Sequence, residues 1–189
     1  MTMNRCRALA ALVCLLAAGG AAAATERVVL ETNRGVIELE LDAAKSPVTT
    51  ANFLKYVDSG FYDGLIFHRV LANFVIQAGG YDVSMKYREP GSAIVNESFN
   101  GLRNVKGSIA MARQSDPDSA EAQFYINVTN NPNLDARPGK PGYAVFGRVV
   151  SGMDVVEAIE LTETHVVDGM AGVPVEPVVI IKARRTPAP

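Results

Sequence analysis

Hydrophobic and polar residues alternate from Leu65 to Leu71, with Ile66, His68 and Val70 on one face and Phe67, Arg69 and Leu71 on the other. This period of two predicts a half-buried strand. After a break at Ala72-Asn73, a second strand begins near Phe74 and ends at Gly79-Gly80. Arg69, Phe74 and Gln77 thus lie on adjoining strands, where they could grip an apolar group and hydrogen-bond a neighbouring amide. The alternative is a strand with one surface arginine and one core phenylalanine.

The same alternation from Thr25 to Asp42, interrupted by Asn33-Arg34-Gly35, predicts a β-hairpin. A helix is expected from Pro47 to Asp58, since Ser46 is a suitable N-cap, proline suits the first helical position and Gly60 follows.

Further along, short apolar segments predict more strands and one more helix. The expected strands are 108–112, 123–128, 143–150 and 173–182, the helix starts at Ser151-Gly152 and ends near Leu161, and the tail 184–189 is expected to be disordered. About eight strands and two helices, without β-α-β alternation, indicate a mostly β barrel or sandwich whose ends the helices could plug.

Residues 1–24 have the pattern of a secretory signal peptide: Arg5 and Arg7, an apolar run from Ala8 to Ala18, and a small-residue tail cut after Ala23 or Ala24. The alternatives are an uncleaved anchor or, less favoured, a lipid anchor on Cys14. The folded domain is therefore expected to span residues 25–183.

The formal net charge is −2, which indicates no nucleic-acid partner. Cleavage would remove both cysteines, Cys6 and Cys14, so the mature domain would form no disulfide. No membrane contact is expected after cleavage.

Several classes of chemistry lack the residues they need. The chain has no glycine-rich phosphate loop, and its two histidines, His68 and His165, do not make a zinc site. His68 is expected to be packed and His165 to be at the surface. Asp116, Asp118 and Glu121 are best interpreted as a solvated loop, because their spacing does not fit a calcium loop. No metal or cofactor is predicted.

A second set of polar and apolar residues could face Arg69, Phe74 and Gln77. Gln123 and Tyr125 share a strand face. The remaining members lie at strand ends or beside loops: Met111, Ala112, Arg113, Leu134 and Tyr143. Together they would form an apolar floor rimmed by amide and guanidinium donors.

The order of these segments resembles the cyclophilin-type peptidyl-prolyl cis-trans isomerases. The matching segments are Phe67–Val70, Phe74–Gly80, Gly107–Ala112, Ala122–Ile126 and Tyr143–Gly147, within a similarity from Arg27 to Lys182. The resemblance, greatest to exported bacterial members, implies a closed eight-stranded antiparallel β-barrel capped by two α-helices. It also implies an active site on the outer barrel face.

The resemblance further implies residue roles. Arg69 would be the catalytic arginine, positioned by Gln123, and Gln77 would hydrogen-bond the substrate backbone. Phe74, Tyr125 and Leu134 would hold the proline ring. Five more residues would line the peptide groove and bind substrate: Val75, Met111, Ala112, Arg113 and Tyr143.

The implied activity is rotation of X-Pro bonds in proline-containing polypeptides and unfolded exported proteins, by a monomer in the periplasm. The alternative is a non-catalytic chaperone module that binds proline peptides. Asn133 stands where cyclosporin-sensitive relatives carry tryptophan, which implies weak cyclosporin binding.

Overall fold

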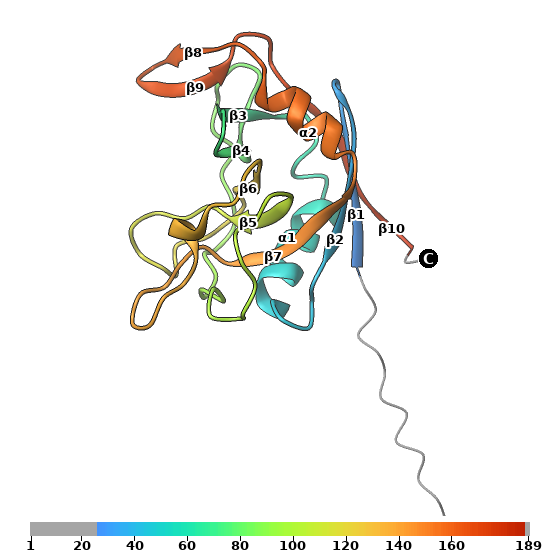
Figure 1. Cartoon of the computed structure of the whole chain (residues 1–189). Coiled ribbons are helices and arrows are strands. Elements are labelled where there is room, and N and C mark those ends of the chain that lie inside the picture. Colours follow the sequence, from blue (N-terminus) through green and yellow to red (C-terminus); the bar gives the residue numbers. More distant parts are fainter. Residues whose placement is uncertain (1–25, 188–189) are drawn as a thin grey trace, which may run out of the picture.

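The computed structural model describes residues 26–187. An eight-stranded antiparallel sheet curls around one core, in the order β10-β1-β2-β7-β5-β6-β4-β3 (Figure 1). The signal peptide expected at residues 1–24 lies outside the described residues. None of the helices within residues 26–187 is both long and apolar enough to cross a membrane.

The strands of this sheet follow the alternation of the sequence. Their bounds are β1 Glu26–Thr32, β2 Gly35–Leu41, β3 Leu65–Leu71, β4 Val75–Asp82, β5 Ser108–Met111, β6 Phe124–Asn127, β7 Val145–Ser151 and β10 Ile180–Thr186. The outer strand β3 meets the residues just before β10 through one isolated bridge, Ile66–Val179, and a hydrogen bond from Phe67 N to Val178 O. The eight-stranded antiparallel sheet is confirmed, whereas its closure into a barrel stays a prediction.

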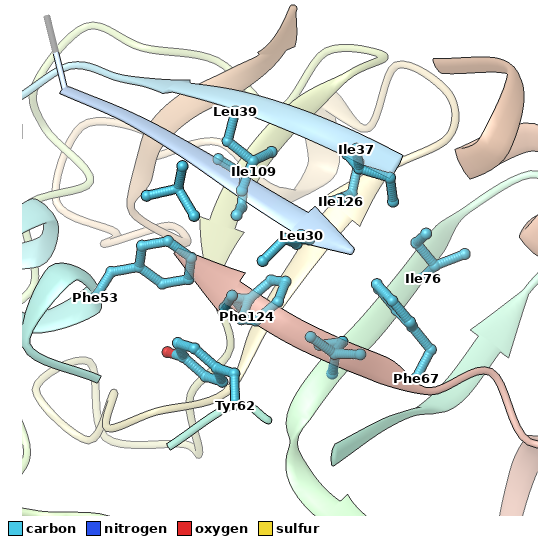
Figure 2. Close-up of a cluster of buried hydrophobic side chains, with 14 of the residues drawn as sticks. Leu30, Ile37, Leu39, Phe53, Tyr62, Phe67, Ile76, Ile109, Phe124 and Ile126 are labelled. Atoms are coloured by element: carbon cyan, nitrogen blue, oxygen red, sulfur yellow. The ribbon is translucent and has the colours of Figure 1, made fainter. Parts of the chain in front are cut away.

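The two predicted helices are confirmed as α1, Pro47–Asp58, and α2, Met153–Glu160, and a 3₁₀ turn, η1, spans Pro132–Leu134. Phe53 of α1 and Ile159 of α2 are fully buried in the same core as the sheet. Figure 2 shows Phe53, Tyr62 and Phe124 meeting there. The ring centroids of Phe53 and Tyr62 each lie 5.3 Å from that of Phe124. Each helix thus covers part of the concave, apolar face of the sheet.

Two expectations for the C-terminal region are wrong. The single strand expected at 173–182 is instead β9, Met170–Pro174, which pairs with β8, Thr164–Val167, followed by β10 (Figure 1). Residues 184–186 are not a disordered tail, because β10 continues to Thr186 and pairs with β1. Its arginines form ion pairs with two neighbouring elements: Arg184 with Glu31 of β1, and Arg185 with Glu26 of β1 and Asp58 of α1.

Helix α1 is capped from a distant loop. Ser46, the expected N-cap, makes no capping bond, because its Oγ donates to Val145 O at 2.9 Å. Glu97 takes its place by accepting hydrogen bonds from Val48 N at 3.1 Å and Thr49 N at 2.8 Å. The loop of Glu97 therefore closes the N-terminus of the helix.

We expect Glu97→Ala to lower the free energy of unfolding by about 1–2 kcal/mol, since two helical N–H groups lose their acceptor. Urea denaturation of the variant measures this. Glu97→Gln retains one side-chain oxygen and should lose less. An unchanged midpoint in Glu97→Ala would contradict the capping role.

Candidate active site

A cavity of about 220 Å³ lies on the face of the sheet opposite the core. Tyr125 lines it, while its strand neighbours Phe124 and Ile126 belong to the core. Nine of the predicted site residues line this cavity: Arg69, Phe74, Val75, Gln77, Ala112, Arg113, Tyr125, Leu134 and Tyr143. Two larger hollows, each about 480 Å³, are lined mainly by loop residues around Ala43–Lys45 and Ser98–Arg103 and contain none of the nine.

An irregularity in β3 places Arg69 in the cavity. Phe67 pairs with Ala78 and Arg69 with Gln77, so two steps on β3 match one step on β4. Such a bulge changes the face that the following side chain occupies. Phe67 and Val70 are therefore in the core while Arg69 lines the cavity. The predicted alternation, with Phe67 and Arg69 on one face, is wrong at this point.

A chain of side-chain amides leads from the interior of the site to Arg69. Gln123 Oε1 accepts from Gln77 Nε2 at 2.9 Å, and Gln77 Oε1 accepts a long bond of 3.5 Å from Arg69 Nη1. Gln123 does not line the cavity, and its link to Arg69 runs through Gln77. Gly80 makes room for Gln123, because a Cβ at that position would lie 2.9 Å from the Gln123 amide.

The rest of the cavity is largely apolar. Phe74, Leu134, Tyr125 and Tyr143 belong to one outer hydrophobic cluster, in which the Tyr125 and Tyr143 rings meet edge to face at 5.9 Å. An apolar ring of a ligand would find aliphatic and aromatic surface here within reach of the Arg69 guanidinium.

The two arginines of the cavity have different surroundings. Arg113 stacks over the Tyr143 ring at 4.6 Å, and its guanidinium donates to Gly142 O, Pro141 O and Gln114 O. Arg69 forms no ion pair within residues 26–187, and its side chain bonds only to Gln77 there. The charge of Arg69 is therefore available to a ligand, whereas that of Arg113 is taken up by the protein.

Met111 is the one predicted groove residue that the structure places elsewhere. Its side chain is 1% exposed and lies in the interior core, while Ala110 and Ala112 on either side belong to the outer cluster. The alternation of β5 sends Met111 inward, so its assignment to the groove is wrong.

His68, as expected, is buried, with its ring 4.8 Å from the Tyr81 ring, whereas His165 is exposed on β8. Burial, assisted by the neighbouring Arg69 charge, lowers the pKa of His68 to about 4. Its Nδ1 has no hydrogen-bond partner within the part of the chain that the structure describes. The folded protein therefore holds this imidazole neutral beside Arg69.

Three buried asparagines behind the cavity, Asn104, Asn127 and Asn131, are not predicted by the sequence pattern. They form one hydrogen-bonded group with the Tyr125 hydroxyl. The sequence feature that could have indicated this group is Asn127, since an asparagine at the end of an apolar strand segment needs buried hydrogen-bond partners.

The low pKa of His68 predicts a pH-dependent stability. Between about pH 6.5 and 4 the unfolded chain binds one proton more than the folded chain, so the free energy of unfolding should fall as pH falls, by on the order of 3 kcal/mol in total. Denaturation midpoints across this range measure the effect. His68→Gln should remove most of this slope while the acid-induced loss from carboxylates remains. Parallel pH profiles of the two proteins would contradict a neutral His68.

Comparison with known proteins identifies the family. The family described as cyclophilin type peptidyl-prolyl cis-trans isomerase/CLD matches residues 27–185. Peptidyl-prolyl cis-trans isomerase A of Dickeya dadantii is 48% identical over 87% of this chain and 86% of its own length. Peptidyl-prolyl cis-trans isomerase B of Escherichia coli is 44% identical over 81% of this chain and 95% of its own.

Solved structures agree on the fold. A Cryptosporidium parvum cyclophilin-type isomerase matches with a TM-score of 0.73 at 23% identity, over 87% of this chain and 99% of that chain. The same protein, in a structure described as determined in the presence of the dipeptide Ala-Pro, matches with a TM-score of 0.71. The family match over nearly the whole described region, together with these relatives, shows that the chain belongs to the cyclophilin-type peptidyl-prolyl cis-trans isomerases.

Proposed function

We propose that this chain accelerates rotation about X-Pro bonds by electrostatic catalysis from Arg69. One observation carries the proposal: Arg69, a cation without an ion-pair partner in residues 26–187, lines the same cavity as the Phe74 ring. In this proposal the proline ring lies against Phe74, Leu134 and Tyr125, and the flanking peptide turns.

The physical basis is the electronic structure of the amide. Resonance gives the C–N bond partial double-bond character and a rotation barrier of roughly 18–20 kcal/mol. At the half-turned geometry the nitrogen lone pair is no longer shared with the carbonyl and can accept a hydrogen bond. A donor aimed at that nitrogen stabilises the twisted state more than either planar state, as catalysis requires. Arginine is permanently charged, so no proton transfer and no cofactor is needed.

Gln77 has a matching role beside the reacting bond. One hydrogen of its Nε2 donates to Gln123 Oε1, and its Oε1 accepts from Arg69 Nη1. A side-chain amide has two N–H donors, so the second remains for a substrate carbonyl. Gln123, which fixes the orientation of this amide, is a positioning residue.

We expect Arg69→Ala to lower kcat/KM for a prolyl peptide by about 10²–10³-fold while the protein still folds. Arg69→Lys should keep partial activity, because a lysine is also charged but lacks the planar fork. Arg34→Ala, at an exposed ion pair with Glu176, is the matched control and should retain full activity. The measurement is a prolyl-peptide isomerase assay. An unchanged rate in a folded Arg69→Ala protein would reject the role of Arg69.

The alternative function is a chaperone module that binds proline peptides without catalysis. A variant in the same cavity distinguishes this binder from an enzyme. In an enzyme, Phe74→Ala should raise KM several-fold and also lower turnover, since the proline ring loses its aromatic contact. The measurement pairs peptide titration with the isomerase assay. A pure binder would show affinity in the unmodified protein, weaker affinity in Phe74→Ala, and no rate enhancement in either.

We further propose that the clients are proline-containing segments of exported proteins and that the enzyme assists their folding in the periplasm. The support is the signal-like pattern of residues 1–24 and the similarity to bacterial relatives. Fractionation of cells expressing the whole chain, with N-terminal sequencing of the product, tests this. A full-length protein retained in the cytoplasm would refute the proposed export.

A further inference from the structure

Asn104 lies directly behind the cavity, in the loop that precedes β5, and is 1% exposed. It does not line the cavity and so would not touch a ligand there. A buried asparagine needs partners for two amide hydrogens and two oxygen lone pairs. The identity of those partners indicates what Asn104 does.

The side chain of Asn104 uses its whole hydrogen-bonding capacity. Its Oδ1 accepts from the Tyr125 hydroxyl at 2.8 Å and from Asn127 Nδ2 at 3.2 Å. Its Nδ2 donates to Asp135 Oδ1 at 3.1 Å and, in a long bond of 3.5 Å, to Tyr143 O. Because the Asp135 carboxylate can only accept, the orientation of the amide is fixed.

The backbone of Asn104 joins the same group. Its N–H donates to Asp135 Oδ1 at 2.7 Å, and its carbonyl accepts from Asn131 N at 2.8 Å. Asn131 and Asp135 flank the 3₁₀ turn that ends at Leu134. Asn131 Nδ2 also donates to Phe74 O at 2.9 Å. One residue therefore connects to Tyr125, Tyr143 and the turn of Leu134 directly, and to Phe74 through Asn131.

We propose that Asn104 is a positioning residue that fixes the walls of the proline pocket, an inference that rests on the proposed function of that pocket. The walls that Asn104 connects are Tyr125 on β6, Leu134 in η1, Phe74 just before β4 and Tyr143 just before β7. Only Tyr125 among them belongs to a strand, so the other three need a further connection to keep their places. Asn104 sets their mutual distances without contacting the substrate.

The ionisation of the partners favours this arrangement. Burial raises the pKa of Tyr125 far above its ordinary value, so the phenol keeps the proton that it donates to Asn104. Partial burial opposes ionisation of Asp135, but hydrogen bonds from Asn104 and Arg103 outweigh it and lower the pKa of this carboxyl. At neutral pH the acceptors and donors of the group are therefore fixed.

The test is Asn104→Ala in the whole folded protein, with saturation kinetics on a tetrapeptide that contains one Ala-Pro bond and calorimetric titration of the same peptide. We expect KM and the dissociation constant to rise about fivefold to tenfold while kcat changes less than twofold. A loosened pocket weakens binding of planar and twisted states alike, which gives this pattern. A purely structural role would lower the active fraction and leave KM unchanged.

Two further variants keep the result decisive. Asn33→Ala is the matched control, because Asn33 also donates and accepts through its side chain, with Pro177 O and Val179 N, in a turn outside the cavity; its KM should equal that of the unmodified protein. Asp135→Ala releases the Leu134 turn and should raise KM twofold to fivefold even if Asn104→Ala does not fold.

The role of Asn104 would be overturned if the variant that folds, Asn104→Ala or Asp135→Ala, had the KM and the dissociation constant of the unmodified protein. Absence of isomerase activity in the unmodified protein would overturn the proposed function instead. The calorimetric comparison would still decide whether Asn104 positions a binding pocket.

Discussion

The bulge between Phe67 and Arg69 is the constraint on which the site depends. Without it, a regular β3 would send Arg69 inward beside Phe67, into a core lined by Phe124 and Ile76. An uncompensated guanidinium there would cost several kcal/mol. With it, both Phe67 and Val70 stay in the core and Arg69 lies over the outer apolar cluster. One inserted residue, His68, thus lets Phe67 and Val70 keep their places in the core while Arg69 stays outside it.

That inserted residue must itself be accommodated. His68 is buried against Tyr81 and is neutral in the fold, so a second positive charge next to Arg69 is avoided. The amide of Gln77, itself bonded to Gln123, accepts a hydrogen bond from Arg69 without adding a negative charge that would neutralise it. The polar side chains next to the cation, His68 and Gln77, are therefore neutral, so they do not cancel its charge.

Elements with local sequence signals could be predicted, and elements that depend on distant contacts could not. Pro47 and Gly60 bracket α1 correctly, yet its capping by Glu97 involves residues far apart in the chain. The β8–β9 hairpin had a signal, Asp168-Gly169 with positive φ at both residues, which suits a tight hairpin turn. The strand role of Arg184 and Arg185 was hidden by their charge, because carboxylates on β1 and α1 pair with them.

The same distinction applies within the cavity. Nine of the residues assigned from the resemblance line one cavity. The resemblance gave Arg69 and Arg113 different roles, but the sequence could not show what physically distinguishes the two arginines, since both lie beside apolar residues. The hydrogen-bond acceptors near each guanidinium make the difference between the two arginines. Arg113 meets several backbone carbonyls and the Tyr143 ring, which leaves its donors occupied and makes it a brace between two loops. Arg69 meets one amide oxygen at 3.5 Å, which leaves most of its donors for a substrate. In this fold the surroundings of a guanidinium, and not the residue type, decide whether its donors stay available to a ligand.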